Sequence, residues 1–246
     1  MPLIVLDAID GAGKSTVIRG IADHFRAQGK AVFDLVAYMQ EHGSLPEVDG
    51  PELANINVLI SAEPTYCWVG KAIREEVIKT HPHRIYDVQT IARFFSEDRL
   101  ILFKHVILPF LQSRADRWVI QDRGCITSLT YQPLDARIKG DTTVTESWIA
   151  SLPGNALELS RPPELLLLLR LAPAVAMDRL AGRTSKVDGD VFEIATFQEQ
   201  LALRYRDPQV LAPYKNAGTA IVEVDASQTP ERVVAEALRH IIALAL

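Results

Sequence analysis

Short runs of apolar residues alternate along the chain with segments whose apolar residues return every three or four positions. The apolar runs predict strands at 3–8, 31–36, 58–61, 117–121, 164–171 and 220–224. The helical spacing, seen for example in Val17, Ile21 and Phe25, predicts helices at 14–28, 66–79, 88–103, 104–111, 127–131, 145–152, 174–181, 192–205 and 230–246. This alternation predicts a parallel sheet with helices on both faces and right-handed crossovers.

Two segments stand out from the alternation. Residues 38–57 are polar and contain two Pro and two Gly, which is typical of an insertion or of a loop with one short helix. Residues 164–171 are apolar almost throughout, as expected for a strand that is covered on both faces.

The composition is that of a globular protein, with 48% apolar and 23% charged residues in 246. This length fits one large domain or two small ones. The net charge of −5 gives no general attraction to nucleic acid, although a local basic pocket is still compatible with it. We therefore expect no nucleic-acid partner.

Two cysteines, Cys67 and Cys125, are too few for a disulfide framework and indicate a reducing compartment. No apolar run approaches the ~20 residues of a membrane span, and the first residues lack the basic region of a signal peptide. We expect a cytoplasmic protein with no membrane partner.

The first predicted strand leads into a glycine-rich turn. Residues 8–15, AIDGAGKS, match the Walker A pattern except that Ala8 replaces its first glycine. Gly11 and Gly13 allow backbone amides to approach a polyphosphate, Lys14 reaches its β- and γ-phosphates, and the Ser15 hydroxyl is a ligand for Mg²⁺. The motif predicts a site for ATP or GTP phosphates but does not separate a kinase from a molecular switch.

Acidic and basic residues are expected at the same edge of the sheet. Asp122 and Arg123 follow a predicted strand, so Asp122 is a candidate Mg²⁺ ligand and Arg123 a candidate phosphate contact. The alternative is a helix cap with a surface salt bridge. Asp10, inside the glycine-rich turn, is expected to order a water on Mg²⁺ or to hold an arginine.

Further candidates lie on two predicted helices. Phe95 and Arg99 are four residues apart, so they share a helix face, where an aromatic ring and a guanidinium suit a nucleobase. The alternative is a core Phe beside a solvated Arg. Arg74 is a candidate anion contact, or else part of a solvated helix face.

These motifs occur in an order that resembles the thymidylate kinase family of P-loop nucleoside monophosphate kinases. The resemblance is carried by residues 7–16 (DAIDGAGKST), 62–74 (AEPTYCWVGKAIR), 94–99 (FFSEDR), 121–132 (QDRGCITSLTYQ), 179–193 (RLAGRTSKVDGDVFE) and 224–233 (VDASQTPERV). It implies a three-layer P-loop kinase fold, with a mainly parallel five-stranded sheet and helices on both faces, as a single domain over 1–246. Residues 38–57 lie outside the resemblance.

The resemblance also implies a set of site residues. The ATP site would comprise Asp10, Gly11, Ala12, Gly13, Lys14, Ser15, Thr16, Arg179, Asp225, Ala226 and Ser227. The dTMP site would comprise Pro64, Arg74, Phe95, Arg99, Arg123, Ser128, Tyr131 and Gln132, with Phe95 stacked on thymine and Arg99 at the base edge. Ser15 and Asp122 would hold Mg²⁺. A homodimer formed through packed helices, with 91–111 as a candidate surface, is implied too.

Residues 179–193 look like the family's lid. Gly182 and Gly189 are possible hinges, and Arg183 and Lys186 are cations that could close over the transferring phosphate. Arg183 is the better candidate for a bidentate contact, because Lys acts as a point charge. A flexible solvated loop is the alternative. Lys14, Asp10, Arg123, Arg183 and Lys186 are thus the candidate catalytic residues.

The chain departs from the family pattern at three positions. Ala62 replaces an arginine before Glu-Pro, Gly124 replaces an aromatic residue or His, and Arg170 replaces an acidic residue. The first puts one acceptor-phosphate contact in doubt. We expect Gly124 to leave a ring-sized space near the sugar.

The expected activity is the transfer of the ATP γ-phosphoryl group to dTMP, giving dTDP, with Mg²⁺. A phosphate acceptor is already ionised near neutral pH, so this reaction needs cations rather than a general base. One alternative is a deoxynucleoside kinase, with Glu63 beside a hydroxyl acceptor, or another nucleoside monophosphate kinase. The other is a non-catalytic P-loop switch, although the sequence lacks the Asn-Lys-x-Asp guanine motif of GTPases.

Overall fold

The structure is a computed structural model that describes residues 2–79, 83–182 and 195–244. In these residues six strands form one parallel sheet in the order β2-β3-β4-β1-β5-β6. The strands are β1 Leu3–Asp7, β2 Val32–Asp34, β3 Val58–Ala62, β4 Trp118–Asp122, β5 Leu165–Arg170 and β6 Ala220–Asp225. The parallel sheet is confirmed.

The expected number of five strands is wrong. The edge strand β2 has only three residues, yet it pairs in parallel with β3 from Val32 to Asp34. Strand structure predicted at 35–36 is also wrong, because helix α2 begins at Leu35. The Asp34 side chain accepts a hydrogen bond from the Ala37 amide at 3.1 Å and so caps that helix.

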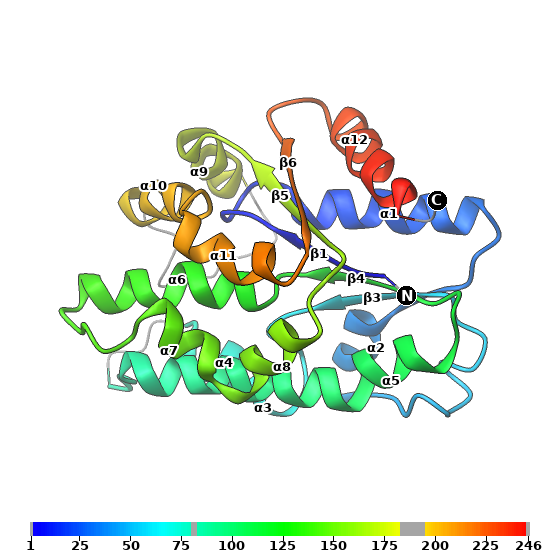
Figure 1. The fold of residues 1–246 in the computed structure, drawn as a ribbon, viewed down its shortest axis with the longest axis horizontal. Helices are drawn as coiled ribbons and strands as arrows, with labels where there is room; N and C mark the ends of the chain where they lie inside the picture. Colours follow the sequence, from blue (N-terminus) through cyan, green and yellow to red (C-terminus); the bar gives the residue numbers. More distant parts are fainter. Residues whose placement is uncertain (1, 80–82, 183–194, 245–246) are drawn as a thin grey trace.

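Helices cover both faces of the sheet. The helical elements are α1 Lys14–Ala27, α2 Leu35–His42, α3 Trp68–Ala72, the π-helical turn η1 Ile73–Val77, α4 Val88–Leu102, the π-helical turn η2 Phe103–Ile107, α5 Leu108–Ser113, α6 Cys125–Ile138, α7 Glu146–Ser151, α8 Pro153–Ser160, α9 Pro173–Ala181, α10 Ala195–Arg204, α11 Pro208–Asn216 and α12 Pro230–Ala243. Figure 1 shows α1 and α12 on one side of the sheet, with α4, α5 and α8 on the other. Among the described helices none is long and apolar enough to span a membrane.

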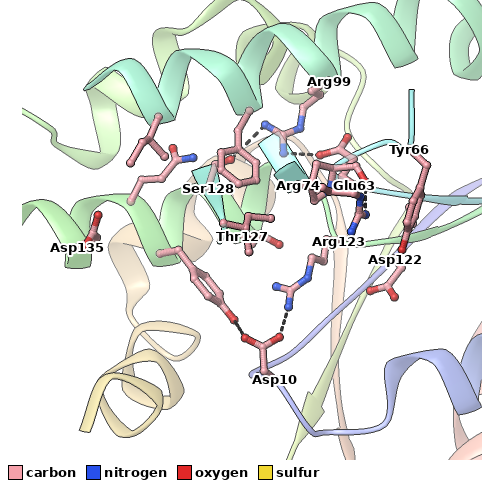
Figure 2. Close-up of a pocket in the computed structure, with 18 residues that line it drawn as sticks. Asp10, Glu63, Tyr66, Arg74, Arg99, Asp122, Arg123, Thr127, Ser128 and Asp135 are labelled. Carbon is pink, nitrogen blue, oxygen red and sulfur yellow. Dashed lines mark hydrogen bonds and ion pairs between the residues drawn. The ribbon is translucent and has the colours of Figure 1, made fainter. Parts of the chain in front are cut away.

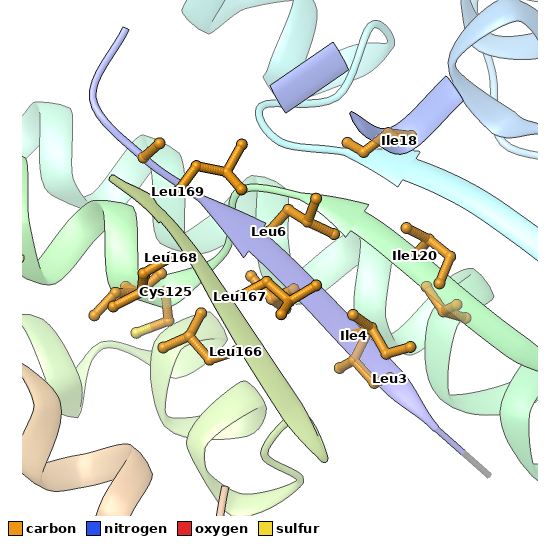
Figure 3. Packing of buried hydrophobic residues seen from close by; sticks show 14 of the residues in the cluster. Leu3, Ile4, Leu6, Ile18, Ile120, Cys125, Leu166, Leu167, Leu168 and Leu169 are labelled. Carbon is orange, nitrogen blue, oxygen red and sulfur yellow. The ribbon is translucent and has the colours of Figure 1, made fainter. Parts of the chain in front are cut away.

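The sheet centre is the core of the molecule. All residues of β1 are buried, as are Leu165–Leu169 of β5, because helices lie on both faces of these strands. Figure 3 shows Leu3, Ile4 and Leu6 packed among side chains of β4 and β5. Burial of each large apolar side chain stabilises the fold by about 1.5–3 kcal/mol, so the strand ends beside the glycine-rich turn have a rigid support.

The polar segment 38–57 begins within α2 and continues as a loop that contacts the core. Leu45 and Leu53 of this loop are buried. Arg117 donates a hydrogen bond to the Leu53 carbonyl at 2.7 Å, and its guanidinium lies 4.2 Å from the centroid of the Phe110 ring. The loop is therefore attached to the side of the molecule that carries β3 and α5.

Candidate active site

The glycine-rich turn joins β1 to α1. Gly11 and Gly13 have left-handed φ angles of 82° and 94°, which glycine adopts without steric cost. A Cβ on Gly11 would also lie 2.3 Å from the Ala176 carbonyl oxygen, so this glycine lets the turn pack on α9. Ala8 is not among the described residues with positive φ. Alanine at the first motif position therefore causes no backbone strain.

One cavity, of about 330 Å³, lies beside this turn. Six of the predicted ATP-site residues line it, namely Gly11, Ala12, Gly13, Thr16, Arg179 and Ala226. The Arg179 guanidinium donates to the Ala226 carbonyl at 3.2 Å. Asp225 and Ser227 line a neighbouring cavity instead, and the Asp225 carboxylate accepts hydrogen bonds from the Ser227 amide and hydroxyl.

Lys14 is buried at the start of α1. Its ammonium group donates a long, 3.4 Å hydrogen bond to the Ala8 carbonyl. Burial lowers the pKa of Lys14 and the neighbouring Arg123 cation lowers it further, whereas nearby carboxylates, Asp122 first among them, oppose the change. An anion bound at the turn would favour the charged amine.

A second cavity, of about 220 Å³, lies between α4, α6 and the ends of β3 and β4 (Figure 2). All eight predicted dTMP-site residues line it: Pro64, Arg74, Phe95, Arg99, Arg123, Ser128, Tyr131 and Gln132. Asp10 and Asp122 line it too. The structure thus brings residues from Asp10 to Asp135, which are far apart in the sequence, around one cavity.

Asp10 and Arg123 form an ion pair at the floor of this cavity (Figure 2). Tyr131 donates its hydroxyl proton to the same carboxylate at 3.0 Å, and the Arg123 guanidinium is 5.4 Å from the Tyr131 ring centroid. Burial raises the pKa of Asp10, but the Arg123 and Lys14 cations together with hydrogen bonds from Tyr131 and Gln198 outweigh it and lower this pKa to about 2. The prediction that Asp10 holds an arginine is confirmed.

Arg123 has an unusual backbone. Its φ is 69°, a left-handed conformation that costs a non-glycine residue of the order of 1–3 kcal/mol. The strained turn is held by the Arg123 amide, which donates to the Leu6 carbonyl at 2.9 Å. The alternative of a surface salt bridge is wrong for Arg123, because its side chain is only 19% exposed.

Arg99 is buried between carboxylates. Its side chain is 1% exposed; Nη2 donates to Glu63, and Nε lies 3.1 Å from Glu158 Oε2. Nη1 donates to Asn155 and, at 3.3 Å, to the Ser128 hydroxyl. Figure 2 shows Arg99 between Ser128 and Glu63. The alternative of a solvated Arg99 is therefore wrong.

The carboxyl groups around Arg99 are themselves buried. Burial raises the pKa of Glu63, with Glu158 and Asp98 adding to this effect and Arg99 opposing it. Asp98 accepts hydrogen bonds from the Thr65 amide at 2.7 Å and the Thr65 hydroxyl at 2.6 Å. These contacts fix the loop that follows β3.

Arg74 lies against the same loop. Its guanidinium is 3.6 Å from the centroid of the Tyr66 ring, and it donates to the Thr65 carbonyl at 3.0 Å and to the Pro64 carbonyl. Burial lowers the pKa of Arg74. The alternative of a solvated helix face is wrong for this residue, which presents a cation to the cavity without a carboxylate in ion-pair contact among the described residues.

Two of the three departures from the family pattern have a structural explanation. A Cβ on Gly124 would lie 3.1 and 3.2 Å from the Glu158 carboxylate oxygens and 3.3 Å from a Val5 methyl group. Glu158 and Val5 thus lie close to where a side chain at position 124 would begin, while Gly124 itself lines the second cavity, and the expected space near the sugar stays a prediction. Arg170 pairs with Glu223 on the neighbouring strand β6. Ala62 lines the second cavity.

The chemistry of Asp122 and Ser15 fits a Mg²⁺ ion bound together with nucleotide phosphates. Asp122 Oδ1 is buried without a hydrogen-bond partner in the described structure, and burial raises the pKa of this carboxyl. Ser15 is exposed in the first turn of α1. The described residues hold no cluster of three His, Cys, Asp or Glu suited to a metal, so phosphate oxygens and water would complete its shell.

Several predicted residues cannot be placed. Arg183, Lys186 and Gly189 lie outside the described residues, whereas Gly182 is the C-terminal cap of α9, which ends at Ala181. Conversely, the residue patterns did not single out Asn155, Glu158 and Gln198, which hold Arg99 and Asp10 in place. Their spacing carries no signal, because an isolated Glu or Asn in a helix is more often solvated.

The parallel sheet, the glycine-rich turn and two adjoining cavities define a P-loop nucleotide-binding enzyme. The chain belongs to the thymidylate kinase family, whose model matches residues 52–237. These enzymes are nucleoside monophosphate kinases and hence phosphotransferases.

Relatives support the family over nearly the whole chain. A probable thymidylate kinase of Methanospirillum hungatei is 25% identical over 240 residues, which cover 96% of this chain and 93% of the relative. A thymidylate kinase of Verminephrobacter eiseniae is 29% identical over 94% of this chain and 86% of the relative. A probable thymidylate kinase of Thermococcus onnurineus is 29% identical over 82% and 81%.

Proposed function

We propose that this protein transfers the γ-phosphoryl group of ATP to dTMP, giving ADP and dTDP. The observation that carries the proposal is the position of the glycine-rich turn between two cavities. Gly11, Ala12 and Gly13 line one cavity, and the preceding residue, Asp10, lines the other. Two nucleotides bound there would have their phosphates close to the same turn.

The cavity proposed for dTMP provides cations, and a phosphate acceptor does not require a general base. An oxygen of the dTMP phosphate attacks the γ-phosphorus, and the bond from that phosphorus to the β–γ bridging oxygen breaks as ADP leaves. The second pKa of a phosphate monoester is about 6, so the attacking oxygen carries charge at neutral pH. Arg123 and Lys14 would stabilise the charge that develops on the phosphoryl oxygens.

Mg²⁺, held by Ser15 and Asp122, would supply further charge neutralisation at the ATP phosphates. Arg183 and Lys186 remain candidates for cations that cover the transferring group. The proposed Mg²⁺ site and the proposed role of Arg183 and Lys186 both agree with the family's use of nucleotides. Both can be tested by mutating these residues.

Phe95 and the polar residues beside it would hold the nucleoside. Phe95 lines the cavity together with Ser128, Tyr131 and Gln132. Stacking of thymine on Phe95, with hydrogen bonds to its edge from Arg99, Ser128 and Gln132, would fix the sugar and phosphate toward Arg123.

A deoxynucleoside kinase is the second candidate, because Glu63 lines the same cavity and burial raises its pKa. A carboxyl with a raised pKa is suited to general-base catalysis on a hydroxyl. However, Gln121 donates to Glu63 Oε1 at 3.1 Å and Arg99 donates to Oε2. Both oxygens thus have a protein donor.

The test is a coupled assay of ADP formation with ATP, Mg²⁺ and one acceptor at a time: dTMP, dUMP, dCMP, dGMP or thymidine. We expect turnover with dTMP to exceed that with each of the other acceptors. Turnover with thymidine but with none of the monophosphates would refute the proposal and favour the nucleoside kinase. ATP hydrolysis that ignores all acceptors would favour a P-loop switch. A homodimer and a cytoplasmic location stay predictions.

A further inference from the structure

Glu158 is a charged residue in the interior of the molecule. It lies on α8, and its side chain has no exposed surface. Its carboxylate forms an ion pair with Arg99 of α4, with 3.1 Å between Nε and Oε2, and accepts hydrogen bonds from the Cys125 amide of α6 at 2.8 Å and the Tyr214 hydroxyl of α11 at 2.9 Å. A buried carboxylate is costly unless it is paired and hydrogen-bonded, and here one ion pair and two hydrogen bonds meet that need.

Two of these partners, Arg99 and Cys125, lie at or next to the second cavity, where the proposed function places the acceptor dTMP. Arg99 lines the cavity on the side of Phe95 and Ser128, where the base is expected. Cys125 begins α6 immediately after Arg123 and Gly124, on the side where the phosphate is expected. Glu158 does not line this cavity, yet its carboxylate contacts both Arg99, on the base side, and the Cys125 amide, on the phosphate side.

We propose that Glu158 is a positioning residue for the acceptor nucleotide: it holds the Arg99 guanidinium and the Arg123–Cys125 turn at a fixed separation, so that one nucleoside monophosphate meets both. The inference rests on the proposed function and deepens it. The acceptor would be a nucleoside monophosphate, because Glu158 positions both Arg99, which would contact the base, and the turn of Arg123, which would contact the phosphate.

Two glycines make room for this arrangement. Gly124, with an extended φ of −169°, lacks the Cβ that would lie 3.1 Å from a Glu158 oxygen. Gly154 lets α8 lie directly on α4, since a Cβ there would lie 1.9 Å from the Ser96 carbonyl oxygen. The Gly154 amide also donates to the Ser96 hydroxyl at 2.9 Å. Glu158 is thus brought to its place by close packing of two helices.

The direct test is E158Q in the full chain, assayed by calorimetric binding of dTMP and by kinetics. Gln keeps the size of the side chain, but it removes the negative charge that pairs with Arg99 and replaces one acceptor oxygen with an NH₂ group that donates. The ion pair with Arg99 is lost, whereas the Tyr214 hydroxyl can accept from the new NH₂ group. We expect the Kd and KM for dTMP to rise about tenfold or more, by about 1.4 kcal/mol per tenfold, with the KM for ATP changed less than about twofold.

Y214F is the matched control, because it removes one donor to Glu158 and leaves the contacts with Arg99 and Cys125. It should lower thermal stability while the Kd for dTMP stays within about twofold. A tenfold loss of dTMP affinity in Y214F as well would overturn the inference, since any disturbance of the core around Glu158 would then be enough to weaken dTMP binding. So would an E158Q protein that unfolds at lower temperature but binds dTMP normally.

G124A provides a second route if E158Q fails to fold. The extended φ of Gly124 is open to alanine, so the added methyl group acts by displacing the Glu158 carboxylate. We expect weaker dTMP binding with unchanged ATP affinity, and unchanged dTMP binding would count against the inference. The coupled assay of the wild type with different acceptors tests the proposed function. The role of Glu158 is tested separately, by comparing the affinities of variant and wild type for whichever monophosphate binds.

Discussion

At the scale of single residues, the site depends on buried ions whose partners are fixed by the protein. Arg123 is held by its strained turn, by Asp10 and, at 3.9 Å, by Asp7. A cation held in this way loses little conformational freedom when a phosphate binds. The same pairing keeps Asp10 ionised far below neutral pH, as its pKa of about 2 indicates.

Arg123→Ala should therefore impair use of the acceptor more than use of ATP. A hydrogen bond to a charged group contributes about 1.5–3 kcal/mol, so we expect kcat/KM for dTMP to fall about 10- to 100-fold. The KM for ATP should change much less. Steady-state kinetics with each substrate varied in turn measures both, with R123K as the control that keeps the charge. If R123A impaired the use of ATP as much as the use of dTMP, the assignment of Arg123 to the dTMP phosphate would be wrong.

Glu63 gives a prediction about pH and stability. Because the folded state raises the pKa of this carboxyl above its usual 4.5, the folded protein keeps a proton that the unfolded chain releases. Stability then falls as pH rises above 4.5, since the folded state binds more protons. E63Q removes this titration. Urea unfolding at about pH 5 and about pH 8 should show the wild type losing stability relative to E63Q, and parallel behaviour of the two proteins would contradict the assignment.

At the scale of elements, the alternating pattern predicted the sheet and the helices around the glycine-rich turn. It did not predict α8 or α11. Pro153 and Gly154 read as helix breakers, yet Pro153 is the first residue of α8, where its missing amide has no cost. Pro208 likewise begins α11, with Asp207 as its cap.

The missed helix α8 explains two of the three missed residues, whereas Gln198 lies on α10, within a helix that was predicted. Asn155 and Glu158, which contact Arg99, come from α8, and Tyr214, which donates to Glu158, comes from α11, so these contacts could not be predicted without the two helices. The strand β2 shows the opposite error, because its predicted apolar run continues into a helix that begins at the Asp34 cap. Local polarity predicted where elements occur better than it predicted where they begin.

Close contact between two elements gives a prediction at this scale. A Cβ on Gly70 of α3 would lie 2.2 Å from the Thr65 hydroxyl oxygen and 2.5 Å from its carbonyl oxygen. G70A should thus displace the loop that carries Pro64 and contacts Arg74, and lower the free energy of unfolding by about 1–3 kcal/mol. Its Kd for dTMP should rise as well.

G182A is the control for G70A in urea unfolding, because the nearest atom to its Cβ is 3.6 Å away and its φ of −78° suits alanine. It should leave stability unchanged or slightly increased. If G70A unfolded at the same urea concentration as the wild type, α3 would not be locked to the loop as the structure indicates.

At the scale of the whole molecule, a parallel sheet brings distant motifs to one edge. The carboxyl ends of β1, β3 and β4 carry Asp10, Pro64 and Arg123 into one cavity. This convergence follows from topology and could be predicted from the sequence. The buried charges that hold the cavity open could not, because their pairing depends on helix packing that residue spacing does not encode.

The proposed function requires that two nucleotides bind at once, one in each of the two cavities beside the turn. At about 100 times its Kd, each ligand should stabilise the fold by about 2.7 kcal/mol, which is a rise in Tm of about 5–10 °C for a chain of this size. We expect dTMP and a non-hydrolysable ATP analogue, added with Mg²⁺, to raise the Tm by the sum of their separate effects. In R123A the shift from dTMP should shrink and the shift from the ATP analogue should persist, which ties each ligand to its own cavity. If the second nucleotide added nothing once the first was saturating, the two would be competing for a single site, and in-line transfer between them would be impossible.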